Sequence, residues 1–101
     1  MKIGITVNNQ EIEYFCARNH IVKLSFFGSV LRDDFNEKSD VDVLVEFEKG
    51  HVPGFFRLAE MEDELSALMG GRRVDIRTSE DLSRYFRKDV VENALVQYDA
   101  G

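Results

Sequence analysis

The feature that most restricts the fold of this chain is the alternation of side chains over residues 41–47. Apolar and mixed positions take turns there, with Val41, Val43, Val45 and Phe47 interleaved with Asp42, Leu44 and Glu46. Successive side chains of a β-strand point to opposite faces of a sheet, so this segment predicts a strand with one fully apolar face. Such a face must be covered by another layer, which the rest of the chain has to supply.

The remaining periodicity predicts helices and two further strands. We expect a helix from the Asn8-Asn9 caps to about residue 20, a buried strand over 21–27, a helix over 55–69 and a short strand over 73–77. Residues 78–81 resemble a helix start, and a last amphipathic helix carries Val90, Val91, Ala94, Leu95 and Tyr98. The order α-β-β-α-β-α predicts an α/β (α+β) domain over residues 1–101, with a small mixed β-sheet flanked by helices.

Composition and charge exclude several classes of protein. No apolar run approaches the ~20 residues that span a bilayer, and the N-terminal residues lack the apolar segment of a signal peptide. Cys16 is the only cysteine and cannot form an internal disulfide, so we expect a cytoplasmic protein without a membrane partner. The net charge of −6 argues against direct nucleic-acid binding and is compatible with a basic protein partner.

Two carboxylates at the start of the 41–47 strand carry the first chemical signal. Asp40 and Asp42 are two residues apart, so both side chains leave the same face of the sheet. They repel each other unless a cation neutralises them, and Mg²⁺ prefers such oxygen ligands. Asp75 lies on another strand, opposite its apolar neighbours; if the strands pair, the three acids are enough for two metal ions about 3.5–4 Å apart.

Gly28-Ser29 supplies the second signal, because a glycine between a strand and a turn lets backbone N–H groups approach a triphosphate. The serine hydroxyl adds a donor to a phosphate oxygen. Taken singly, each feature has an ordinary explanation: Gly28-Ser29 as a turn, and Asp40 and Asp42 as solvated acids at a strand edge. Their combination within fifteen residues favours a nucleotide site.

Gly28-Ser29, ten residues, and then Asp40-Val41-Asp42 resembles the signature of the nucleotidyltransferase superfamily that includes DNA polymerase β. The short length, residues 44–47 and Arg73-Val74-Asp75-Ile76 are similar to its minimal nucleotidyltransferase branch, and the resemblance extends from about Phe26 to Tyr98. The resemblance implies an antitoxin that transfers AMP from ATP to a tyrosine of a HEPN-type ribonuclease toxin and can form a hetero-oligomer with it.

By the same resemblance, Gly28 and Ser29 would hold the triphosphate, and Asp40 and Asp42 would bind metal. Asp75 would complete the metal site and help to deprotonate the attacking hydroxyl. Two residues depart from the family pattern: Arg77 replaces an apolar residue after the third carboxylate, and Arg84 stands near the usual place of a proline. These departures leave the signature intact and affect the expected contact with a partner.

Other polar residues carry weaker signals. Arg32 could steady a phosphate or be a solvated arginine, and Ser39 could cap or orient the start of the Asp40 strand; both are candidate nucleotide-binding residues. The acids of residues 60–64 are interpreted as the water-facing side of a helix. His20 and His51 have no partner at metal-ligand spacing in the sequence and are interpreted as structural or surface residues.

Three functions remain open from the sequence. The first is a protein adenylyltransferase that silences a toxin, and the second is an antitoxin that neutralises its toxin by direct binding without catalysis. The third is nucleotide transfer to a small molecule. The intact set of three carboxylates favours the enzyme over the binder. Enzymes acting on small molecules carry a further helical domain, so a 101-residue chain favours an acceptor on another protein.

Overall fold

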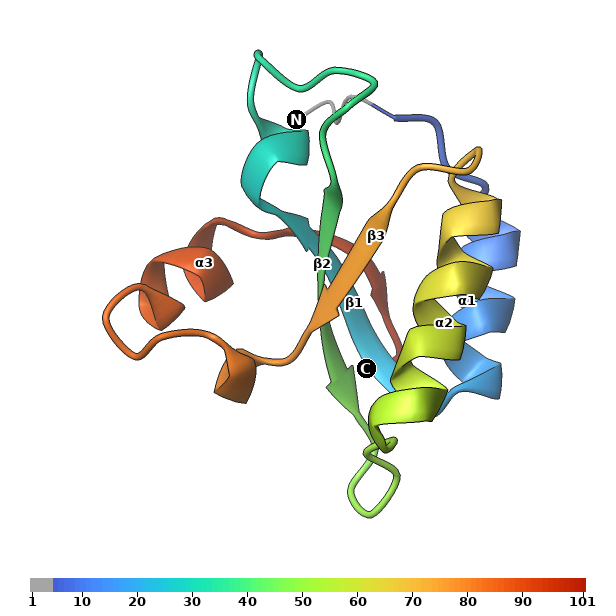
Figure 1. The fold of residues 1–101 in the computed structure, drawn as a ribbon. Helices are drawn as coiled ribbons and strands as arrows, with labels where there is room; N and C mark the ends of the chain where they lie inside the picture. Colours follow the sequence, from blue (N-terminus) through green and yellow to red (C-terminus); the bar gives the residue numbers. More distant parts are fainter. Residues whose placement is uncertain (1–4) are drawn as a thin grey trace.

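A computed structural model describes residues 5–101 of the chain as a four-stranded sheet with helices packed on it (Figure 1). The elements in chain order are α1 (Asn9–Arg18), β1 (Ile21–Phe27), the 3₁₀ turn η1 (Gly28–Leu31), β2 (Val41–Phe47), α2 (Phe55–Leu68), β3 (Val74–Arg77), the 3₁₀ turn η2 (Ser79–Asp81), α3 (Arg87–Asn93) and β4 (Leu95–Asp99). The strand order across the sheet is β3-β2-β1-β4.

The sheet is mixed, as the sequence predicts. β1 pairs antiparallel with both β2 and β4, whereas β2 and β3 are parallel. Parallel neighbours need a crossover connection, and α2 provides it between β2 and β3. The prediction of an α/β fold with a small mixed sheet flanked by helices is therefore confirmed.

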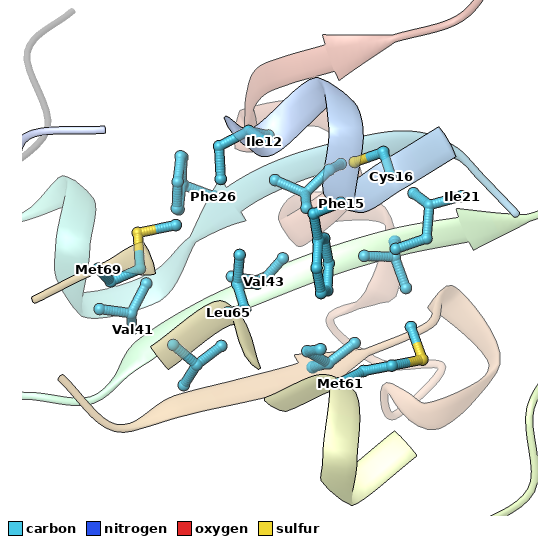
Figure 2. Packing of buried hydrophobic residues seen from close by; sticks show 14 of the residues in the cluster. Ile12, Phe15, Cys16, Ile21, Phe26, Val41, Val43, Met61, Leu65 and Met69 are labelled. Atoms are coloured by element: carbon cyan, nitrogen blue, oxygen red, sulfur yellow. The ribbon is translucent and has the colours of Figure 1, made fainter. Parts of the chain in front are cut away.

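The hydrophobic core lies between the sheet and the helix pair α1 and α2, which run along the same side of it in Figure 1. Figure 2 shows side chains of both helices meeting those of the strands. The fully buried members of this core include Ile12, Phe15, Leu24, Phe26, Val41, Val43, Met61 and Leu65. The periodicity that predicts these helices is thus the spacing of the residues that cover the apolar strand face.

Local signals set the helix ends. The Asn8 side-chain oxygen accepts a hydrogen bond of 3.0 Å from the Glu11 N–H and caps the start of α1. Within residues 5–101 the longest helix, α2, has 14 residues, and no helix in that range is long and apolar enough to cross a membrane.

The last predicted helix is wrong in its second half. α3 ends at Asn93, Ala94 is extended, and Leu95–Asp99 form β4 on the outer edge of β1. The spacing of apolar residues over 90–98 fits a helix, but β1 has an unpaired edge that the end of the chain can satisfy with backbone hydrogen bonds. Tyr98 also packs against the core from this strand, so edge pairing outweighs the local periodicity.

Candidate active site

The turn between β1 and η1 fits only glycine at its first position. Gly28 has φ +72°, in the left-handed region that other residues rarely adopt. A Cβ atom there would lie 2.5 Å from Oδ2 of Asp42. Asp42 is close because it pairs with Phe27 across the β1–β2 ladder. The absence of a side chain at residue 28 therefore lets the turn pack against a carboxylate.

Ser29 joins this turn to both acids of the Asp40-Val41-Asp42 segment. Its hydroxyl donates a hydrogen bond of 3.0 Å to the backbone carbonyl of Asp40, and its backbone N–H is near enough to the Asp42 carboxylate to lower the pKa of that group. A hydroxyl has a single hydrogen, so contact with a phosphate oxygen would require the Ser29 hydroxyl to turn away from Asp40.

Asp42 and Asp75 are direct neighbours on adjacent strands. They are register partners in the parallel pair β2 and β3, and their flanking residues Val41, Val43 and Ile76 point into the core. Both carboxylates therefore leave the sheet on the face turned away from α1 and α2. The structure thus places Asp42 and Asp75 on one face, as the alternation in the sequence predicts.

The surroundings of Asp42 shift the pKa of its side chain. Partial burial raises the pKa of Asp42 above its ordinary 3.8, and the negative charges of Asp75 and Asp40 raise it further. The Ser29 N–H and the Arg77 guanidinium partly oppose this rise. A cation beside Asp42 would relieve this repulsion between negative charges. Asp40, Asp42 and Asp75 are therefore the residues that could hold a divalent metal ion.

Two arginines already contact these acids. Nε and Nη2 of Arg77 both lie 3.1 Å from Oδ2 of Asp75, and Nε of Arg73 lies 3.9 Å from Oδ1 of Asp40. From the sequence, Arg77 is only a departure from the family pattern, and no role is predicted for Arg73. Arg77 lies two residues after Asp75 on β3, so both side chains leave the same face, and this spacing is the signal that could have indicated their pairing.

One hollow is lined by two of the carboxylates, and a second lies beside the Gly28 turn. One, of about 400 Å³, is lined by Asp40, Glu62, Asp63, Ser66, Arg73, Val74 and Asp75. The other, of about 390 Å³, is more apolar and lies beside Gly28 and Arg32, with α3 as its opposite wall. Together they provide space next to the acids for a nucleotide and for an acceptor group.

Glu62 corrects the prediction that the acids of residues 60–64 only face water. Its Oε2 accepts a hydrogen bond of 2.8 Å from the backbone N–H of Ile76. β3 is an edge strand, and this contact satisfies one of its outward N–H groups. The helical periodicity places Glu62 off the apolar stripe but does not reveal that β3 lies within its reach.

Arg32 and Ser39 are held by the loop in which they lie. Nε of Arg32 is 3.4 Å from Oδ1 of Asp34 on the protein surface, and the Ser39 hydroxyl accepts a hydrogen bond of 3.1 Å from the Asn36 N–H. Arg32 also lines the hollow beside Gly28. Their predicted roles in nucleotide binding stay predictions.

Comparison with known proteins agrees with this geometry. The nucleotidyltransferase domain family matches residues 9–97. The protein adenylyltransferase MntA of Thermococcus cleftensis is 32% identical over 91 residues, which cover 90% of this chain and 86% of that protein.

Solved structures share the fold. One of a protein assigned as a minimal nucleotidyltransferase superposes with a TM-score of 0.70 and 34% identity over 86% of each chain. A crystal structure of a toxin–antitoxin with AMP-PNP superposes with a TM-score of 0.72 over 92% of this chain and 74% of that chain; at 18% identity it shows the shared fold alone. A matching family, a similar relative and the same fold confirm the resemblance seen in the signature: this chain belongs to the nucleotidyltransferase domain family.

Proposed function

We propose that this nucleotidyltransferase is an antitoxin that transfers AMP from ATP to a tyrosine of a HEPN-type ribonuclease toxin and so silences it. The observation that carries the proposal is the register pair of Asp42 and Asp75 beside the Gly28-Ser29 turn. The relative from Thermococcus cleftensis is named a protein adenylyltransferase, and a protein with the same fold was crystallised as a toxin–antitoxin with AMP-PNP.

In this proposal Asp40, Asp42 and Asp75 would hold Mg²⁺, as two ions. When bound, Mg²⁺ would supply positive charge that neutralises the triphosphate and the three acids. The raised pKa of Asp42 supports such a fit, because it reflects crowding of negative charge that no arginine contact fully relieves.

Gly28, Ser29 and Asp75 have different roles in the proposed reaction. Gly28 lets the turn pack against the Asp42 carboxylate, and Ser29 holds the turn against Asp40. Asp75 takes the proton of the attacking hydroxyl, which a phenol with an ordinary pKa near 10 does not release at neutral pH. The phenolic oxygen forms a bond to the α-phosphorus of ATP, the bond to the β-phosphate oxygen breaks, and pyrophosphate leaves.

The partner is proposed from charge as well as from the relatives. A net charge of −6 attracts a basic ribonuclease over distances of about one Debye length, so association should slow as salt increases. AMP on a tyrosine near the ribonuclease site would add a bulky anion where RNA phosphates must bind, which blocks the site by charge and volume.

Neutralisation by direct binding alone is the second candidate. Three large aromatic side chains lie on the surface: Phe55, Phe56 and Tyr85 are 80–85% exposed. Aromatic residues in such positions are enriched where proteins bind each other. A complex held by these side chains would inhibit a toxin without any transfer.

Intact-mass spectrometry of the toxin separates the two candidates. After incubation with this protein, ATP and Mg²⁺, the toxin should gain the mass of one or more AMP units, and the Asp40→Asn/Asp42→Asn variant should abolish the gain. The variant Asp33→Asn/Asp34→Asn is the matched control, since it removes the same charge from exposed positions of the same loop. Neutralisation without a mass change, equally strong with Asp40→Asn/Asp42→Asn, would establish direct binding instead.

A further inference from the structure

Three side chains that the sequence keeps apart meet at the other end of the sheet. His20 directly precedes β1, Glu48 directly follows β2, and His51 lies in the next turn. In Figure 1 the loop that follows β2 lies at the opposite end of the sheet from the η1 turn. The seven residues of β1 separate this cluster from Gly28 by about 20 Å, so it is distinct from the carboxylate site.

Backbone hydrogen bonds hold the three residues in place. The N–H of Glu48 donates to the carbonyl of His20 at 2.8 Å, and the N–H of His51 donates to the carbonyl of Glu48 at 3.0 Å. These bonds position the backbone of all three residues independently of their side-chain conformations. The backbone that carries these ligands therefore loses little conformational entropy when an ion binds.

His20 adopts a left-handed backbone conformation directly after the C-cap of α1. Its φ of +58° makes it the one non-glycine residue with positive φ within residues 5–101. Left-handed conformations cost free energy for residues with a Cβ atom. His20 is exposed, so burial of its ring does not offset this cost.

The side chains themselves converge. Nδ1 of His20 lies 3.2 Å from Oε2 of Glu48, and the rings of His20 and His51 stack with centroids 3.9 Å apart and planes at 14°. One ligand atom from each of the three residues lies within 4.8 Å of the others. The side chains of His20 and Glu48 are about half exposed, at 48% and 51%, which leaves them free to rotate.

We propose that His20, Glu48 and His51 form a binding site for a divalent transition metal of the Zn²⁺ class. Two imidazole nitrogens and one carboxylate oxygen are a set of ligands that Zn²⁺ uses, at metal–ligand distances of about 2.0–2.2 Å. Mg²⁺ prefers an all-oxygen environment, so this site should not compete for it. In-plane lone pairs of two nearly parallel rings 3.9 Å apart cannot both point at one ion, so one exposed ring has to rotate for both nitrogens to bind it.

An ion here would link three segments of the chain. It would fasten the α1–β1 junction to the end of β2 and to the turn that leads into α2. Three protein ligands leave a coordination position for water or for a side chain of a bound protein. The site is independent of nucleotide transfer, and its loss should leave the carboxylate site unchanged.

Zinc binding to the untagged protein tests the proposal by isothermal titration calorimetry. We expect one Zn²⁺ per chain, and an affinity that falls about 10- to 100-fold or more in His51→Ala and in His20→Asn, since even indirect partners of a metal contribute that much. Asparagine tolerates the positive φ of residue 20, so His20→Asn keeps the backbone. Because the carboxylates of Asp40 and Asp42 could also take Zn²⁺, the titrations are made in excess Mg²⁺, and the exposed pair Asp33→Asn/Asp34→Asn is the control that should bind Zn²⁺ like the parent.

NMR of the parent protein gives a readout that needs no variant. His20 and His51 are the only histidines in the chain, so the imidazole signals of both should shift together as one equivalent of Zn²⁺ is added. Cys16 does not compete, because it is buried and its pKa is raised to about 12. Unchanged imidazole signals, or Zn²⁺ binding that is lost in Asp40→Asn/Asp42→Asn and kept in His51→Ala, would overturn the proposal.

Discussion

Replacing Gly28 with alanine perturbs the turn and the carboxylate site at once. The new Cβ atom meets two costs: the left-handed backbone at φ +72°, and a contact of 2.5 Å with Oδ2 of Asp42. The first is about 1–2 kcal/mol, and moving Asp42 off its rotamer adds about 0.5–1.5 kcal/mol. A total of about 2–3 kcal/mol should lower the melting temperature by about 8 °C or more in a domain of this size.

Gly70→Ala is the matched control for this change. Gly70 has φ +74°, nearly the same as Gly28, but nothing lies within 4 Å of a Cβ built on it. It should therefore meet only the backbone cost. Differential scanning calorimetry of both variants isolates the contact with Asp42, and titration with ATP and Mg²⁺ should show weakened binding in Gly28→Ala alone. Equal losses of stability, with equal ATP binding, would refute the reasoning about this contact.

Three further predictions concern the charges and the core. Because the pKa of Asp42 is raised in the folded state, its ionisation destabilises the fold as pH rises above about 3.8. In metal-free buffer Asp42→Asn should therefore have a higher melting temperature than the parent at pH 7, and this difference should disappear in acid. A difference that does not change with pH would show that the pKa of Asp42 is not raised by folding. Arg77→Gln removes the guanidinium that contacts Asp75 and also lowers the pKa of Asp42. The acids then repel each other more, so the rise in melting temperature on adding Mg²⁺ with ATP should be larger in a thermal-shift assay. A smaller rise would make Arg77 a ligand of the nucleotide. Cys16, buried and with a pKa of about 12, should react with a thiol reagent at pH 8 only at the rate of unfolding, and rapid labelling of the native protein would contradict its burial.

Much of the fold follows from the sequence because its signals are local. The alternation over 41–47 marks β2 and also places Asp42 on the face away from the core. Asp75 follows the same rule on β3, so the common face of these acids is predictable before their strands are known to be neighbours. Asn8 likewise caps α1 through a side chain only three residues away.

What the sequence does not predict depends on contacts between distant segments. β4 forms because β1 has a free edge with which it can pair. The spacing of apolar residues over 95–99 cannot predict this pairing. Glu62 bonds to Ile76 only because β3 lies beside α2. His20 and His51, interpreted as residues without a partner at metal-ligand spacing, meet Glu48 because β1 and β2 bring residues 20 and 48 into backbone contact. Both histidines are exposed, so their interpretation as surface residues is confirmed. Their meeting with Glu48 could not be predicted, since sequence spacing says little about neighbours across a sheet.

The fate of a labelled phosphate tests the central claim most directly. With the partner toxin, Mg²⁺ and ATP labelled at either the α- or the γ-phosphate, we expect label on the toxin from the α-position alone, because AMP is the group transferred. Asp75→Asn should reduce this transfer far more than it reduces ATP affinity, since a base acts mainly in the transition state. Label from the γ-position, or none from the α-position while the toxin is still neutralised, would contradict the account.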